Sequence, residues 1–253
     1  MVFSKKKVAG LLFASLLLVL LGLMRSVVTP DSDVVLVDHG EQLLQKVFGL
    51  ERKPENNIID SFTFREDGRE KFAALFVTGT EGDCHGCGVK VGGGVLMNRD
   101  GVWEVDVLTK EIGTYGSFGV LGKLKNVSIG SNKKAFQFDW SGLSQGYLVS
   151  GLSIVGIYGG VFRQFINLTT NEENGGTGYE DPYLYSYSSI VTFVQGKNPA
   201  YYDIAVKRTG TIPGGQEDIL KFGDVDFSLR RAVPVYEEFV YELVDGTYQL
   251  TQR

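Results

Sequence analysis

Residues 72–97 read FAALFVTGTEGDCHGCGVKVGGGVLM, and this segment decides the class of fold. An apolar, strand-forming run opens it at residues 72–78, and a second apolar run closes it at residues 89–97. The corner between them is rich in glycine, and each glycine at 88 and 92–94 disfavours a helix by about 1 kcal/mol relative to alanine. The pattern therefore predicts two strands joined by a corner that holds the chain's two cysteines.

Cys84 and Cys87 are separated by two residues, a spacing that several chemistries use. A redox dithiol needs a helix after the second cysteine, and the glycines that follow Cys87 oppose one. A zinc site needs four ligands, and the chain adds only His39 and His85 to the two cysteines. Haem attachment needs a histidine directly after the second cysteine, where Gly88 stands. We expect a structural disulfide, with thiol–disulfide exchange as the alternative, provided that the corner lies in an oxidising compartment.

The first 25 residues have the pattern of a membrane-targeting segment. Lysines at positions 5–7 precede an uncharged, mostly apolar run over residues 8–24, which Arg25 closes. The length of this run lies between that of a signal-peptide core and that of a membrane span. No clear small-residue cleavage site precedes Arg25, which favours an uncleaved anchor over a removed signal peptide. Because the basic cluster comes first, we expect the rest of the chain to be periplasmic or extracellular, with cleavage and secretion as the alternative.

The composition is that of an ordinary folded domain behind this segment. Hydrophobic residues make up 43% of the 253 residues and charged residues 22%, which excludes a disordered chain. Four of the 25 basic residues and none of the 30 acidic residues lie in the first 25 positions, so the remainder has a net charge of −9. This balance argues against a nucleic-acid partner.

We divide the chain into a membrane anchor or signal segment at 1–25, a connector with a short helix at 26–54, and a β-rich exported domain at 55–253. The helix in the connector is predicted to begin at Asp38, which has the capping-box spacing to Glu41. Apolar residues at 43, 44, 47 and 48 then share one helical face. This prediction places His39 in the first turn of an amphipathic helix.

After Pro54 the hydrophobic period changes from about 3.6 to about 2 residues and stays there almost to the end of the chain. Asp-Gly, Asn-Gly and Gly-Gly turn signals, and a further one at Pro213-Gly214-Gly215, separate the apolar segments, and no helical pattern of useful length intervenes. We therefore predict a mainly β fold, with antiparallel strands in a sandwich, a barrel or a curved half-barrel. The predicted strands cover residues 61–64, 72–78, 89–97, 102–108, 133–140, 147–158, 161–168, 185–194, 202–208 and 239–248.

Residues 142–146 match the Gly-x-Ser-x-Gly pattern of a hydrolase nucleophile elbow. That motif needs a helix after the serine and a histidine later in the chain. Another predicted strand begins at residue 147 instead, and no histidine follows His85. The motif is therefore predicted to be a turn between two strands.

An acidic, glycine-rich loop over residues 171–181 lies between two predicted strands. Closely spaced oxygen ligands on a flexible loop suit a calcium ion, although the spacing is not that of an EF-hand. We expect the protein to have no cofactor, with calcium at this loop as the alternative.

Tyr183, Tyr185 and Tyr187 alternate along the chain, so a strand through them would place three rings on one face. Exposed rings of this kind bind glycans or protein partners, whereas packed rings would cover the core. We take these three tyrosines as the candidate binding residues.

The chain contains few of the residues that hydrolytic and metal-dependent enzymes most often use. With two histidines and one close cysteine pair, most hydrolytic and metal-dependent sites lack their parts. We therefore expect a membrane-tethered β-domain that acts as a non-catalytic binding module or as a subunit of a cell-envelope assembly, with a protein or glycan partner. The enzymatic alternatives are a thiol–disulfide oxidoreductase that uses Cys84 and Cys87, and a carboxylate-based hydrolase.

Overall fold

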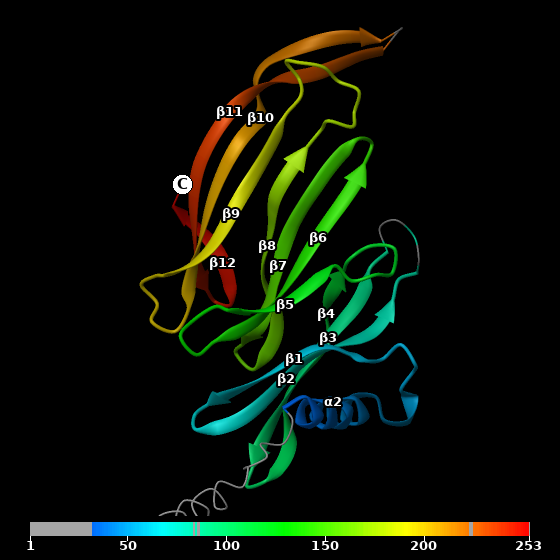
Figure 1. The fold of residues 1–253 in the computed structure, drawn as a ribbon, viewed down its shortest axis with the longest axis vertical. Helices are drawn as coiled ribbons and strands as arrows, with labels where there is room; N and C mark the ends of the chain where they lie inside the picture. The colour runs from blue at the N-terminus through cyan, green and yellow to red at the C-terminus, as the bar shows by residue number, and fades with distance from the viewer. Residues whose placement is uncertain (1–31, 83, 85–86, 223–224, 253) are drawn as a thin grey trace, which may run out of the picture. The chain divides into compact units, whose positions relative to one another are not determined.

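The computed structural model describes residues 32–82, 84, 87–222 and 225–252. The predicted membrane segment at residues 8–24 lies outside this part of the chain. Within the described part, no helix is both long enough and apolar enough to cross a membrane. The fold is mainly β, as predicted: the described residues form twelve strands in two antiparallel sheets, together with one helix and a short 3-10 turn (Figure 1).

The first sheet has four strands in the order β1-β2-β3-β4, so every strand pairs with its neighbours in sequence. The predicted segment at 72–97 supplies its two central strands, β2 and β3. The bounds are Ile58–Glu66 for β1, Arg69–Thr80 for β2, Val89–Arg99 for β3 and Val102–Tyr115 for β4.

The second sheet has eight strands, again in sequence order from β5 to β12. The prediction that residues 142–146 connect two strands is confirmed, because β6 and β7 pair as a hairpin that ends at Ser144 and Tyr147, with the turn itself at Gln145 and Gly146. The bounds are Lys123–Ser128 for β5, Lys134–Ser144 for β6, Tyr147–Tyr158 for β7, Val161–Glu173 for β8, Ser186–Gln195 for β9, Tyr202–Phe222 for β10, Val225–Val244 for β11 and Thr247–Gln252 for β12.

Two predictions in this sheet were wrong. The segment at 239–248 is not one strand, because it contains the end of β11, a turn and the start of β12. The Pro213-Gly214-Gly215 signal is not a turn between strands but an irregularity inside β10, where the pairing with β11 shifts register between Pro213 and Glu217. Proline and glycine are common at such bulges because the local ladder of hydrogen bonds is already broken.

Both faces of β2 and β3 are covered, which explains why these strands read as continuous apolar runs rather than as alternating ones. One face of the first sheet packs against the helix α2 (Ser32–Phe48), where the rings of Phe48 and Phe76 lie 5.7 Å apart. The other face contributes Leu75 and Val91 to a core cluster that also contains residues of β6, β7 and β8.

The glycines of β3 permit close packing on both faces. A Cβ atom at Gly93 would lie 2.7 Å from the ring of Phe162 on β8, and one at Gly94 would lie 2.7 Å from the side chain of Leu43 on α2. Real side chains do not approach that closely, so larger residues here would separate the layers. The glycines that argued against a helix after Cys87 are therefore required by the packing of the sheet.

The helix α2 begins at Ser32, so the predicted start at Asp38 was wrong. An aspartate inside a helix costs at most about 0.7 kcal/mol relative to alanine, which is too little to end a helix. His39 lies within α2, is buried, and packs against the rings of Trp103 at 4.1 Å and Phe72 at 5.6 Å. It therefore serves as a packing residue of the first sheet.

A second core cluster lies within the second sheet. It joins Ile154 and Phe165, from β7 and β8, to Ile204, Phe239 and Tyr248, from β10, β11 and β12. Val127 on β5 packs against the same cluster, so strands at opposite ends of the sheet order share one core. They do so although β8 and β9 pair over only three residue pairs, from Asn171–Ser188 to Glu173–Ser186.

Candidate functional site

The two cysteines lie at the corner between β2 and β3. Their sulfur atoms are 2.03 Å apart, which confirms the predicted disulfide. The corner is held by the backbone N–H of Glu81, which donates to the carbonyl oxygen of Gly88, and by the N–H of Gly119, which donates to that of Cys87. The chain after Cys87 enters strand β3, so the disulfide lacks the helix N-terminus that stabilises the thiolate in redox dithiols.

The acidic loop between β8 and β9 is organised by Asn174, which is 2% exposed. Its Nδ2 atom donates to the carbonyl oxygen of Tyr183 (2.9 Å), and its Oδ1 atom accepts from the backbone N–H of Tyr185 (2.8 Å). Among the described residues, no three or more His, Cys, Asp or Glu side chains converge as a metal site would require. Calcium at this loop remains a prediction.

The three candidate tyrosines have different surroundings. Tyr185 and Tyr187 are 9% and 8% exposed, and both hydroxyls donate to the carboxylate of Glu172. Burial, followed by the bond to this carboxylate, raises the pKa of Tyr185. Tyr183 is half-buried and donates to Asp218 Oδ2 at 2.9 Å. Their role in binding remains a prediction, and of the three it is Tyr183 that lines an open groove.

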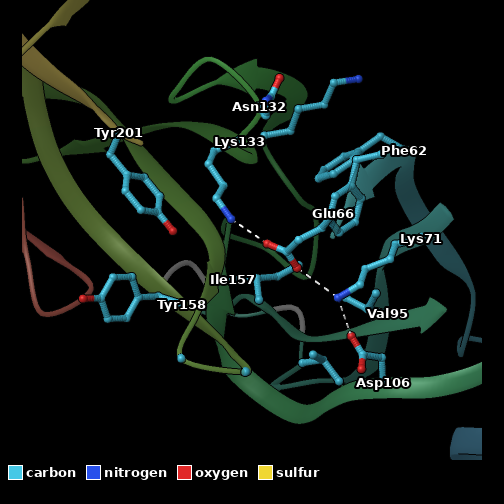
Figure 2. Close-up of a pocket in the computed structure, with 15 residues that line it drawn as sticks. Phe62, Glu66, Lys71, Val95, Asp106, Asn132, Lys133, Ile157, Tyr158 and Tyr201 are labelled. Atoms are coloured by element: carbon cyan, nitrogen blue, oxygen red, sulfur yellow. Dashed lines mark hydrogen bonds and ion pairs between the residues drawn. The ribbon is translucent and has the colours of Figure 1, made fainter. Parts of the chain in front are cut away.

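A charged cavity of about 160 Å³ lies between the two sheets. Figure 2 shows Lys71 reaching Glu66 and Asp106, while Lys133 approaches Glu66 from the opposite side. Lys71 Nζ lies 2.9 Å from Glu66 Oε2 and 2.8 Å from Asp106 Oδ2. Because Lys133 belongs to the connection between β5 and β6, its ion pair with Glu66 on β1 joins the second sheet to the first.

The charges in this cavity neutralise one another. Hydrogen bonds from Lys133 and Lys71 hold the pKa of Glu66 below its usual value. Burial opposes the charge on Lys71, but hydrogen bonds to Asp106 and Glu66 outweigh it and raise the pKa of the lysine. A glycosidase acid needs the opposite shift, and a pocket for a drug-sized ligand measures roughly 300–1,000 Å³. The cavity is therefore best explained as an ion-paired contact between the sheets.

A larger groove, of about 630 Å³, lies beside the outer half of the β10–β11 hairpin. Its apolar wall comes from Leu220 on β10 and from Phe227 and Leu229 on β11. The connection between β8 and β9 forms the opposite wall. This wall consists of Thr177, Gly178, Tyr179, Glu180, Asp181 and Tyr183.

Two contacts fix the connection against the hairpin. The backbone N–H of Ala232 on β11 donates to the carbonyl oxygen of Pro182 at 2.7 Å. Asp218 accepts from Tyr183 and also pairs with Arg231, whose Nε lies 2.7 Å from Asp218 Oδ2. Hydrogen bonds from Arg231 and then Tyr183 lower the pKa of Asp218. The groove is thus formed by two segments that are held together independently of any ligand.

Sequence reasoning singled out one wall of this groove, through the acidic loop at 171–181 and Tyr183, but it missed the hairpin residues of the other wall. Phe227 is 48% exposed and Leu220 39%, so these apolar side chains remain accessible to solvent. A weak signal was present, because Phe227 and Leu229 alternate with Ser228 as they would in a strand.

Asp203 is a further carboxyl group with altered chemistry. Burial raises its pKa, as a general acid would require. Yet Asp203 lines neither the charged cavity nor the groove. Asp203 therefore marks no substrate site in either of these two spaces.

The groove and the charged cavity differ in volume, in exposure and in charge. The groove combines ligand-like volume, exposed apolar residues and acidic residues, whereas the cavity is small and internally neutralised. Compared with known protein families, curated proteins and solved structures, the chain matches none.

Proposed function

We propose that this protein is a non-catalytic binding module that holds a protein partner in the groove beside the β10–β11 hairpin. The observation that carries the proposal is the groove itself, which has the volume of a ligand site and an apolar wall open to solvent. Apolar residues that remain exposed in this way mark interaction sites. A protein partner suits this wall better than a glycan, because Leu220, Phe227 and Leu229 offer no hydrogen bonds.

We further propose that the module is tethered to a membrane through residues 8–24 and works in a cell-envelope assembly on the periplasmic or extracellular side. The basic-then-apolar order of the N-terminal segment supports this orientation. The bonded pair of Cys84 and Cys87 is consistent with an oxidising compartment. We also infer that the second sheet curves into a half-barrel around the cluster that joins its first and last strands.

Photo-crosslinking in the native membrane tests the binding function. The photoreactive residue p-benzoylphenylalanine replaces Phe227 in the full-length chain, and a control chain carries it at Val102, which is 61% exposed on the first sheet. We expect irradiation to give one discrete adduct from position 227 and none from position 102, with the partner identified by mass spectrometry. An absent adduct, or the same adducts from both positions, would reject the proposal.

A matched pair of substitutions then shows which face of the hairpin carries the contact. Leu220 lines the groove, whereas its neighbour Ile219, which is 70% exposed, points to the opposite face of the strand. Leu220→Ser should reduce the yield of the adduct from position 227, and Ile219→Ser should leave it unchanged. Equal loss in both variants would mean that the groove does not select the partner.

A further inference from the structure

We infer that the occupant of the groove is an extended segment of the partner, with apolar and basic residues on one face, which adds a strand to the open edge of β10. This inference rests on the proposed function and specifies the chemistry of the partner. Two separate observations support it, the charge of the groove and the unpaired edge of the strand.

The charge of the groove favours a cation. Glu180 and Asp181 are exposed in its wall, and among the described residues that line it none is basic. Arg231 lies nearby but is already paired with Asp218 at 2.7 Å. The chain after residue 25 has a net charge of −9, which would also attract a basic segment over a distance. A lysine or arginine of the partner therefore complements this wall.

The edge of β10 is open where it borders the groove. Strand β9 pairs with β10 from Tyr202 to Gly210, and no described strand continues on that side, although β10 extends to Phe222 (Figure 1). After the register shift at Pro213, residues 217–222 pair regularly with β11. These six residues present an edge of about 20 Å with unpaired backbone groups, which is a template for an added strand.

The alternation of side chains then sets the partner's pattern. Leu220 lies directly opposite Phe227 in the pairing of the two strands, and both line the groove. An added strand would place every second residue on this same face. An apolar residue there would contact Leu220 and extend the apolar wall that Leu220 forms with Phe227, and a basic residue two positions away would face the carboxylates of Glu180 and Asp181.

A fluorescein-labelled octapeptide, Lys-Thr-Val-Thr-Leu-Thr-Lys-Thr, has this pattern, and its binding to the full chain in detergent is measured by fluorescence anisotropy. We expect Glu180→Gln combined with Asp181→Asn to weaken binding by about fivefold, the effect of losing two exposed charge pairs. The control combines Glu70→Gln with Glu111→Gln, two exposed residues of the first sheet, and should bind as the wild type does.

Two further peptides keep the test independent of how the variants fold. A peptide with glutamate in place of both lysines should not bind. A peptide with N-methyl groups on alternate residues keeps the side chains but loses the backbone donors that strand addition needs, so its binding should also be lost. The inference is overturned if either of these two peptides binds as tightly as the basic octapeptide, or if the basic octapeptide does not bind. A crosslink from position 227 under those outcomes leaves the proposed function standing, whereas an absent crosslink removes the function itself.

Discussion

Lys71 connects two acidic side chains in the cavity between the sheets, and its own side chain is 12% exposed. We predict that Lys71→Met lowers the free energy of unfolding at pH 7 by about 2 kcal/mol, because Glu66 and Asp106 would lose their shared cation. The expected cost is below the roughly 3–5 kcal/mol for a fully buried pair, because Glu66 remains partly exposed. Urea unfolding of the wild type and the variant measures the difference.

The ion pairs of Lys71 with Glu66 and Asp106 also predict how the difference in unfolding free energy between the wild type and Lys71→Met depends on pH. The pKa of Glu66 is lowered in the folded state, so its ionised form stabilises the fold above about pH 4.3 and this contribution is lost as the pH falls further. The gap between the wild type and Lys71→Met should therefore narrow from pH 5 to about pH 3. Glu70→Met, at an exposed position of the same strand, controls for surface effects. If this difference in unfolding free energy stays constant with pH, the ion pairs do not contribute to the stability of the fold.

At the scale of elements, the sequence predicts most strands because burial on one or two faces leaves a readable apolar pattern. It fails for the outer half of the β10–β11 hairpin, where each strand has only one neighbour among the described strands and few of the side chains whose burial is described are buried. Pro213-Gly214-Gly215 then resembles a turn, although the structure uses it as a bulge. The groove depends on this hairpin, so Tyr183 was found from the sequence while Leu220 and Phe227 were not.

The same hairpin predicts a gradient of backbone stability. Residues 202–210 of β10 have strands on both sides, whereas residues 217–222 pair only with β11 among the described strands. A two-stranded ribbon is marginally stable, so we expect amides at 217–222 to exchange at least about tenfold faster than those at 202–210. Hydrogen exchange read by mass spectrometry measures both segments in one experiment.

Tyr183→Phe provides the control for this gradient, because it removes the hydroxyl that donates to Asp218 while keeping the ring. Exchange at 217–222 should become faster still, and exchange at 202–210 should not change. Uniform protection along β10 in the isolated protein would contradict the prediction and would show that something other than β9 covers the outer edge.

At the scale of the whole molecule, the first core cluster determines whether the two sheets can unfold separately. Phe136 on β6 is fully buried, and its ring lies 4.8 Å from that of Phe62 on β1. The cluster also contains Val95 on β3 and Phe162 on β8, so each sheet covers apolar surface of the other. Neither sheet could open without exposing this shared surface, which favours a single cooperative transition.

The two tryptophans report on the two sheets, since Trp103 lies on β4 and Trp140 on β6. In Trp103→Phe and Trp140→Phe, each with one remaining tryptophan, we expect fluorescence-detected guanidinium unfolding to match the transition followed by circular dichroism in the same variant. Adding Phe136→Ala should lower the free energy of unfolding by about 3–5 kcal/mol in both backgrounds, because a buried ring is lost from a core common to both sheets. If the variant that retains Trp103 kept its fluorescence transition while the one that retains Trp140 lost stability, the sheets would be independent domains. The charged cavity would then have to be a contact between domains rather than part of one fold.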